Sequence, residues 1–420
     1  MGITNLLKNL SSITVKGVNL SRYAGEVAAV DALCWLHQSA YGCAKEMCEG
    51  GAEDKYVAYC MNLVELLLNN GIIPVLVFDG RNVPIKERTN NKRNQSREEN
   101  LQKARELESQ GKMEEAKRCY NAAVRITPEM YIPLINRLIE RGVSYIIAPY
   151  EADVELAFLA RHHLVDFVIT QDGDSLVYGC EKVLFKLMPE GKGNEVQYRN
   201  VFNASELAIR DFSNEMFMYL CILSGCDYLS NPPNKGMKRL VPFVKRGKTP
   251  DGILQCLQNE GSCEITEEYR SDFRKAINSF HYQVVFDPCT QTQTTLSPVP
   301  EGFDLSQHTY LGVIEEDPDV VKQLSRLQIH PLTREKMEII PFPDSYDPLG
   351  FLSLKKGQTA KPKLNLFGFY SVKSVSKSNP RVEKEKVVEE KEKNGIKSKY
   401  FSSCCRVIKE NDLKSYRYKG

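Results

Sequence analysis

Short apolar runs recur along the first half of the chain, separated by longer stretches in which apolar residues repeat at helical spacing. Each run is four to six residues long and is typical of a buried strand. Strands that alternate with helices predict an α/β fold around a mostly parallel sheet, in which ligands bind at the carboxyl ends of the strands. The runs are Val27–Val30, Ile73–Phe78, Tyr145–Ala148, Phe167–Thr170 and Val183–Leu187.

Acidic residues follow four of these five runs. Each acid taken alone is equally well explained as a solvated residue or a helix cap. Because parallel strands end at the same edge of a sheet, we expect these acids to converge. A seventh acid lies in "LSGCDYLS", whereas Glu155 and Asp166 are left out as ordinary acids. The set is Asp31, Asp79, Glu151, Asp153, Asp172, Asp174 and Asp227.

Seven carboxylates in one place would repel one another strongly unless cations neutralise them. A set of hard oxygen ligands without His or Cys favours Mg²⁺ or Mn²⁺ over Zn²⁺. Two such ions about 3.5–4 Å apart can clamp the attacking and leaving oxygens of a phosphoryl transfer. Glu151 and Asp153 would diverge in the middle of a helix, but both can reach the sheet edge from a first helical turn.

A long polar insert, 81–130, separates the second and third runs. It predicts helices over Lys86–Gln110 and Met113–Arg125, and the second resembles half of a tetratricopeptide repeat that has no further copy. Lys86 and Arg93 lie seven residues apart, on one helix face and about 10 Å from each other. They are candidates to hold a phosphate and balance charge in a transition state.

The pattern becomes helical after Asp211, beginning with Met216–Ser224. The stretch from Lys235 to Lys248 has six basic residues and no acids. Such a stripe suits contacts to duplex phosphates, and the alternative is a solvated surface. We expect an α/β core over 1–212, a helical nucleic-acid-binding region over 213–290, an extension packed on the core over 291–350 and a disordered tail over 351–420.

Composition narrows the class of protein without identifying it. Of the 420 residues, 42% are hydrophobic and 26% are charged, as in soluble globular proteins. No apolar run approaches the roughly 18–20 residues of a membrane span, and we expect neither a signal peptide nor N-myristoylation, since Leu6 replaces the required Ser or Thr. Thirteen cysteines and six histidines show no zinc-module spacing and indicate free thiols in a reducing compartment.

Seven motifs along residues 1–290 resemble the flap-endonuclease/XPG superfamily of structure-specific 5′ nucleases, in particular its exonuclease branch. They are "MGI" at Met1, "VAAVDALCWLH" at Val27, "PVLVFDG" at Pro74, "APYEADVELA" at Ala148, "ITQDGDSLVYGC" at Ile169, "MYLCILSGCDYLS" at Met218 and "YQVVFDP" at Tyr282.

The resemblance implies a PIN-like core, a helical arch at the insert and a helix–two-turn–helix region. It also implies that the seven acids bind two Mg²⁺ ions (Mn²⁺ can substitute), with Lys86 and Arg93 on a gateway helix. The DNA-contacting residues that it implies are Gly2, His37, Lys186, Gly236, Lys238 and Arg239.

Two positions depart from the family pattern. Asn234 replaces the first glycine of the helix–two-turn–helix hairpin, where the family binds a monovalent cation. Asn tolerates positive φ, so we expect the turn to form, while cation binding stays open. Leu33 stands where the exonuclease branch often has an aromatic residue.

The tail segment "KLNLFGFY" resembles a sliding-clamp-binding box through Leu366, Phe369 and Tyr370, and lysine clusters in the tail are compatible with nuclear import.

Taken together, the residues and the resemblance predict a magnesium-dependent 5′→3′ double-stranded DNA exonuclease that also cuts 5′ flaps. We expect a nuclear enzyme of mismatch repair and recombination, acting on duplex DNA with a 5′ end, nick, gap or flap. Mismatch-repair proteins and a sliding clamp are its expected partners, and no membrane is involved. The alternatives are a replication flap endonuclease and a catalytically inactive DNA-binding scaffold.

Overall fold

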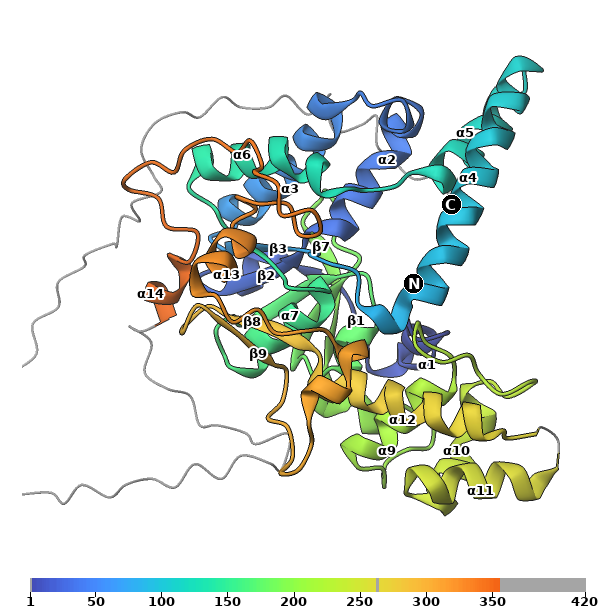
Figure 1. Ribbon diagram of the computed structural model, residues 1–420. Helices are drawn as coiled ribbons and strands as arrows, with labels where there is room; N and C mark the ends of the chain where they lie inside the picture. The colour runs from blue at the N-terminus through green and yellow to red at the C-terminus, as the bar shows by residue number, and fades with distance from the viewer. Residues whose placement is uncertain (1, 262–263, 356–420) are drawn as a thin grey trace, which may run out of the picture. The chain divides into compact units, whose positions relative to one another are not determined.

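The computed structural model describes residues 2–261 and 264–355, all of which belong to one compact unit (Figure 1). The predicted clamp-binding residues Leu366, Phe369 and Tyr370 lie outside the described residues, as does nearly all of the tail predicted to be disordered.

A seven-stranded sheet forms the centre of the fold, in the order β1-β7-β6-β5-β2-β3-β4. The five strands from β6 to β4 are parallel, whereas β7 pairs antiparallel with both β6 and β1. All five predicted runs are strands, so the predicted α/β class is confirmed. The strands are β1 (Val15–Asn19), β2 (Val27–Asp31), β3 (Ile73–Phe78), β4 (Ser144–Ile147), β5 (Phe167–Thr170), β6 (Lys182–Phe185) and β7 (Lys192–Gln197).

Helices cover both faces of the sheet, as strands that are apolar on both sides require. The helices α2, α3 and α6 lie on one face and α7 lies on the other (Figure 1). Ala28 and Val30 of β2 join the apolar cluster formed with α2, α3 and α6. The bounds are α1 (Leu6–Asn9), α2 (Ala32–Cys48), α3 (Glu53–Asn69), α6 (Tyr131–Arg141), α7 (Ala152–Arg161) and α8 (Asp174–Val177).

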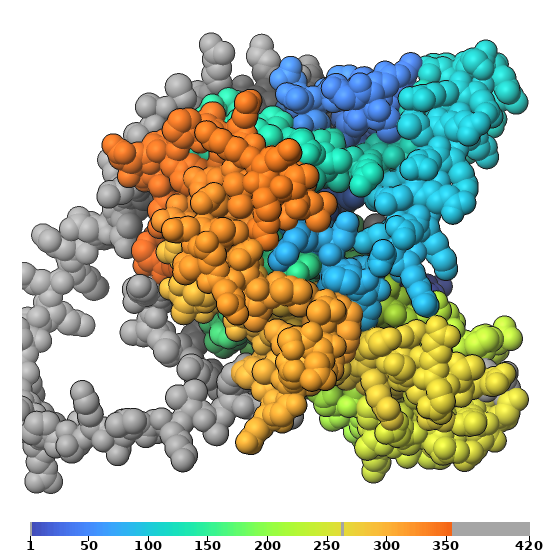
Figure 2. Space-filling model, in the orientation of Figure 1, coloured from blue at the N-terminus to red at the C-terminus, as the bar shows by residue number. Residues whose placement is uncertain are grey.

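The insert forms the helical hairpin predicted for it, as α4 (Glu87–Ser109) and α5 (Met113–Ala123). It projects from the same side of the molecule as the helices α10 (Met237–Gly247), α11 (Pro250–Glu260) and α12 (Glu267–Tyr282) (Figure 2). The Nζ atom of Lys45 in α2 lies 2.5 Å from Oε1 of Glu108, and the Tyr120 hydroxyl donates to Oε2 of Glu108 at 2.8 Å. The far end of the hairpin is therefore fastened to the core.

The remaining helices follow the sheet in the chain. The predicted helix Met216–Ser224 is present as α9, and the hairpin β8–β9 packs against α7. The bounds are α9 (Asn214–Leu223), α10 (Met237–Gly247), α11 (Pro250–Glu260), α12 (Glu267–Tyr282), β8 (Val284–Asp287), β9 (Thr292–Thr295), α13 (Pro318–Ser325) and α14 (Phe351–Lys355). Among residues 2–261 and 264–355, no helix is both long and apolar enough to cross a membrane.

One buried carboxyl group lies away from the sheet edge. Glu155 of α7 is fully buried, its Oε2 accepts a hydrogen bond from the Phe286 amide at 2.8 Å, and its Oε1 has no partner among the described residues. Burial raises the pKa of Glu155 to about 8. At neutral pH Glu155 is therefore protonated in the folded protein, whereas in the unfolded chain it has already released this proton.

This proton makes stability depend on pH with a definite sign. Between about pH 4.5 and pH 8 the native state holds the extra proton, so the free energy of unfolding falls as pH rises through this window. We predict that Glu155→Gln raises the melting temperature by at least about 3 °C at pH 9 and changes it little at pH 5. Calorimetric melting across this range measures the effect, with the exposed Glu99→Gln as control. Equal shifts at both pH values would contradict the assignment.

Candidate active site

The parallel strands deliver six of the seven predicted acids to one edge of the sheet. Asp31 is the last residue of β2 and caps α2, and Asp79 directly follows β3. Glu151 caps α7 and Asp153 lies in the first turn of that helix, so both reach the edge as predicted. Asp172 follows β5, and Asp174 begins α8. The paired registers Val30–Ile169 and Phe78–Ile147 place the ends of these strands side by side.

The acids lie close enough to perturb one another electrostatically. Burial raises the pKa of Asp153 well above its ordinary value, and the charges of Asp172, Asp31 and Asp174 raise it further. Burial and the charge of Asp172 also raise the pKa values of Asp31 and Asp174. The pKa of Asp79 is raised to about 7 by burial, with contributions from Asp31 and Glu151. Excess negative charge is therefore concentrated at this edge.

Positive charge from the insert meets the acids directly. Nζ of Lys86 lies 2.7 Å from Oε1 of Glu151 and 3.1 Å from Oδ2 of Asp227. A guanidinium nitrogen of Arg93 lies 2.5 Å from the other oxygen of Asp227. Burial would raise the pKa of Asp227, but these two cations lower it below the ordinary value. The structure thus brings the seventh acid and both predicted basic residues to the same place.

The donor set suits a hard divalent cation, since it consists of carboxylate oxygens. The Oδ1 atom of Asp153 is buried without a hydrogen-bond partner, which is costly unless a cation or water satisfies it. As the side chains lie, with Lys86 between Glu151 and Asp227, no three His, Cys, Asp or Glu residues in the described part of the chain are arranged to hold a metal ion. The chemistry of the residues fits such an ion, but their present arrangement is that of an ion-paired site.

Two local features hold the acids in place. The Oδ1 atom of Asp31 accepts from the Cys34 amide at 3.0 Å, while its Oδ2 accepts from the Thr170 hydroxyl at 2.8 Å. A Cβ atom on Gly2, whose φ is +85°, would lie only 1.8 Å from an oxygen of Asp172. Glycine is therefore required at position 2. The amide of the next residue, Ile3, donates to Oδ1 of Asp174 at 2.7 Å.

The structure places two more predicted residues near this site. His37 of α2 is half-buried, and burial together with the positive charges of Arg97 and Arg93 lowers its pKa to about 4. It therefore lies next to the basic face of α4. Lys186 is exposed and directly follows β6, with φ of 52°. Because β6 is parallel to β5, Lys186 lies at the same edge of the sheet as the acids.

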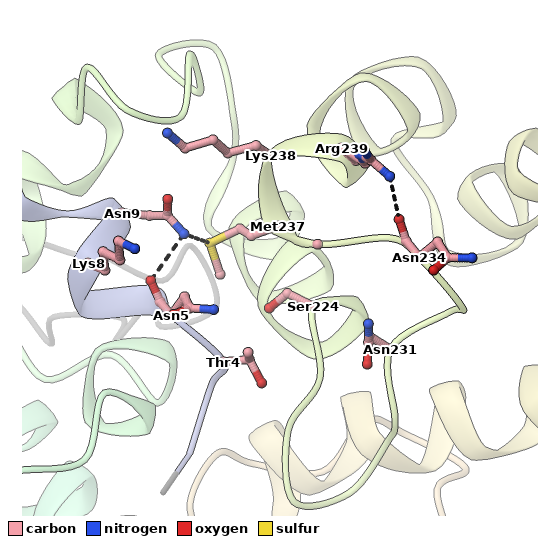
Figure 3. Close-up of a pocket in the computed structure, with 11 residues that line it drawn as sticks. Thr4, Asn5, Lys8, Asn9, Ser224, Asn231, Asn234, Met237, Lys238 and Arg239 are labelled. Atoms are coloured by element: carbon pink, nitrogen blue, oxygen red, sulfur yellow. Dashed lines mark hydrogen bonds between the residues drawn. The ribbon is translucent and has the colours of Figure 1, made fainter.

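Gly236, Lys238 and Arg239 line a second feature, a cavity of about 520 Å³ between α1 and the start of α10 (Figure 3). Lys238 and Arg239 are exposed. The opposite wall contains Asn5, Lys8 and Asn9, which had no signal in the sequence because α1 is a single helical turn. Three cationic side chains, Lys8, Lys238 and Arg239, line the cavity.

The turn before α10 is formed as expected at Asn234, which has a φ of 59°. The side-chain amide of Asn231 donates to the Lys235 carbonyl at 3.3 Å and so closes the turn. Lys235 itself is buried and pairs with Glu260, with Nζ 2.6 Å from Oε1. Its inclusion in a solvent-facing basic stripe was therefore wrong, because the neighbouring α11 supplies a carboxylate that the sequence pattern does not reveal.

Comparison with known proteins agrees with this geometry. A family model of the XPG N-terminal domain matches residues 1–100, and one of the XPG I-region matches residues 142–227. Together the two segments contain all seven acids, Lys86 and Arg93. Nucleases of this family generally depend on divalent metal ions.

Three similar proteins cover most of this chain. Exonuclease 1 of Danio rerio is 37% identical over 340 residues, which are 80% of this chain and 42% of that protein. Exodeoxyribonuclease 1 of Saccharomyces cerevisiae is 32% identical over 371 residues, 88% of this chain and 51% of that protein. The DNA damage-inducible protein DIN7 of S. cerevisiae is 31% identical over 326 residues, 77% of this chain and 75% of that protein.

The chain thus spans about half the length, or less, of the exonuclease 1 proteins that it matches. DIN7 is matched over three quarters of its length at more than 30% identity, and the two family models bracket the site described above. The chain therefore belongs to the flap-endonuclease/XPG superfamily of structure-specific 5′ nucleases, on its exonuclease 1 side.

Proposed function

We propose that the chain is a magnesium-dependent 5′→3′ double-stranded DNA exonuclease that also cuts 5′ flaps. The observation that carries the proposal is the meeting of Asp227, Glu151, Lys86 and Arg93 beside the carboxylates at the sheet edge. Acids alone would serve many metal sites. Acids that are paired with the side-chain cations of Lys86 and Arg93 suit a substrate that is itself a polyanion, such as a nucleic-acid backbone.

In this proposal, Asp31, Asp79, Glu151, Asp153, Asp172, Asp174 and Asp227 hold two Mg²⁺ ions, directly or through water. Bound divalent ions would supply Lewis-acid activation of water and stabilisation of the leaving oxygen. Lys86 and Arg93 exchange their carboxylate partners for the scissile phosphate and balance its growing charge. Thr170, Cys34 and the Ile3 amide keep Asp31 and Asp174 in fixed orientations.

The cavity between α1 and α10 is the proposed site for the duplex backbone. Lys8, Lys238 and Arg239 would contact phosphates there without reading sequence. The N-terminal segment joins this cavity to the acids, because Lys8 lies only five residues after Ile3, whose amide binds Asp174. We propose that two further residues lie along the path of the DNA strand that enters the site at the sheet edge. They are Lys186 and His37, which lies beside Arg93 and Arg97.

The biological setting is part of the proposal, and the names of two relatives support the choice of enzyme class. Two of the proteins compared above are named exonuclease 1 or exodeoxyribonuclease 1, which favours the exonuclease over a replication flap endonuclease. We propose a nuclear role in mismatch repair and recombination, with a sliding clamp bound through Leu366, Phe369 and Tyr370. The alternative of an inactive scaffold is disfavoured, since all seven acids and both cations are present.

We predict that Asp174→Asn abolishes cleavage and leaves duplex binding within about twofold of the wild type. Asparagine keeps an oxygen that accepts from the Ile3 amide but removes the charge that a metal ion requires. Cleavage of nicked duplex and of 5′-flap DNA in Mg²⁺ or EDTA measures activity, and fluorescence anisotropy measures binding. The exposed Asp54→Asn is the control. Normal cleavage by Asp174→Asn, or wild-type cleavage in EDTA, would contradict the proposal.

Lys86→Ala and Arg93→Ala should each lower the single-turnover cleavage rate by about 10²–10³-fold. Each removes a preorganised positive charge from the position of the scissile phosphate. Lys92→Ala is the matched control, because Lys92 lies beside Arg93 in α4 but is exposed to solvent. Equal losses in all three variants would mean that α4 contributes only general positive charge.

The double variant Lys238→Ala/Arg239→Ala should weaken duplex binding to a similar extent for every sequence tested. We expect the slope of log affinity against log salt concentration to fall by about two, since two phosphate contacts are lost. Lys245→Ala, on the same helix but paired with Asp211, is the control. An unchanged salt slope would show that the duplex does not use the cavity.

A further inference from the structure

A buried side-chain amide connects the end of α12 with the acid cluster. Gln283, between α12 and β8, is fully buried. Its Nε2 lies 2.7 Å from the Tyr228 hydroxyl, 3.2 Å from the Tyr178 hydroxyl and 3.1 Å from the Ser279 carbonyl. The Ser279 carbonyl can only accept, so it fixes the amide with its nitrogen toward the two phenols.

The phenols continue this connection to the sheet edge. The hydroxyls of Tyr178 and Tyr228 lie 2.5 Å apart, and the Tyr228 hydroxyl donates to Oε2 of Glu151 at 2.7 Å. The ring of Phe280, from the last turn of α12, packs against both, with centroids 4.7 Å from Tyr178 and 5.4 Å from Tyr228. All three aromatic side chains are buried.

The direction of the hydrogen bonds is set by the groups at the two ends. The amide nitrogen of Gln283 can only donate, and Oε2 of Glu151 accepts from the Tyr228 hydroxyl. The Tyr228 hydroxyl therefore donates its single proton to Glu151, while its oxygen accepts a hydrogen bond from Gln283. The Tyr178 hydroxyl, 2.5 Å away, then donates to the Tyr228 oxygen.

Tyr228 also contacts the cation that Glu151 holds. Its ring centroid lies 5.2 Å from Nζ of Lys86, and it directly follows Asp227, the other partner of Lys86. With Oε2 of Glu151 engaged by Tyr228, only Oε1 faces Lys86, at 2.7 Å. One phenol thus sets which oxygen of Glu151 is available for a cation.

We propose that Gln283 is a positioning residue that acts through Tyr228 to hold the carboxylate of Glu151 in the orientation that suits a divalent cation. The inference rests on the proposed function and deepens it, because it assigns residues outside the carboxylate set to the same site. It also links α12 to the sheet edge through two hydrogen bonds. Gln283 and Tyr228 lie 55 positions apart in the chain, and Tyr228 and Glu151 lie 77 positions apart. Hydrogen bonds of this kind behind a ligand carboxylate commonly change metal affinity by about 10–100-fold.

The test compares Tyr228→Phe, Gln283→Met and the double variant with the wild type. Tyr228→Phe keeps the ring and removes the hydroxyl, which donates to Glu151, accepts from Gln283 and contacts the Tyr178 hydroxyl. Tyr198→Phe is the matched control, because Tyr198 is also buried but donates to Asn214, away from the acids. Mn²⁺ binding is measured by isothermal titration calorimetry in the absence of DNA, and melting temperature is recorded for each variant.

We expect Tyr228→Phe to weaken Mn²⁺ binding about tenfold or more, and Gln283→Met to weaken it by a smaller factor. Because Gln283 acts through Tyr228, the double variant should bind Mn²⁺ no more weakly than Tyr228→Phe alone. The concentration of Mg²⁺ that gives half-maximal cleavage should rise in the same order. Tyr198→Phe should leave both measurements unchanged.

Other outcomes overturn the inference. Wild-type Mn²⁺ affinity in both single variants, even with lowered melting temperatures, would make the amide and phenols structural only. Additive losses in the double variant would mean that Gln283 does not act through Tyr228. If Gln283→Met does not fold, unchanged Mn²⁺ binding in Tyr228→Phe alone is sufficient to reject the connection. If the wild type neither binds Mn²⁺ nor cleaves DNA, the proposed function fails together with this inference.

Discussion

Mutual repulsion among carboxylates at one edge of the sheet is the constraint on which the rest of this structure depends. Parallel strands bring Asp31, Asp79, Asp153 and Asp172 to that edge, and burial with neighbouring negative charge raises the pKa values of Asp31, Asp79 and Asp153. Such an arrangement is stable only when donors and positive charges compensate it. The compensating groups come from every part of the chain that surrounds the edge.

These groups arrive from elements that are distant in sequence. The N-terminal segment supplies the Ile3 amide, the insert supplies Lys86 and Arg93, and the turn after α9 supplies Asp227 and Tyr228. The insert and the helical region are therefore fastened to the same cluster of carboxylates as the N-terminus, through Glu151 and Asp227 in the first case and Asp174 in the second. A ligand that changes the charge at this edge would act on all three elements at once. Substrate entry would in this way be coupled to the assembly of the reactive site.

The sequence predicts those parts of the fold that produce a repeating pattern. The five parallel strands are short apolar runs, and the acids that follow them are visible because each ends such a run. The strands β1 and β7 were not predicted, since β1 has only Val18 buried and β7 contains Lys192, Gly193 and Asn194. The edge strand β1 and its antiparallel neighbour β7 lack the continuous apolar character of the parallel strands.

Individual tertiary contacts are harder to predict, because a single residue has no periodicity. Gln283 and Tyr178 lie 105 positions apart, and nothing in either local sequence indicates that they meet. Lys235 was misassigned to the solvent-facing stripe for the same reason, as its partner Glu260 lies on another helix.

The most direct test of the whole account is a crystal structure of the chain grown with Mn²⁺, in which the metal ions are located by anomalous scattering. The account predicts two peaks about 4 Å apart at the sheet edge, each about 2.0–2.3 Å from carboxylate oxygens of the seven-acid set, with Lys86 displaced from Glu151 or Asp227. Saturating Mn²⁺ that leaves no peak among these acids, or that binds only elsewhere on the molecule, would contradict it.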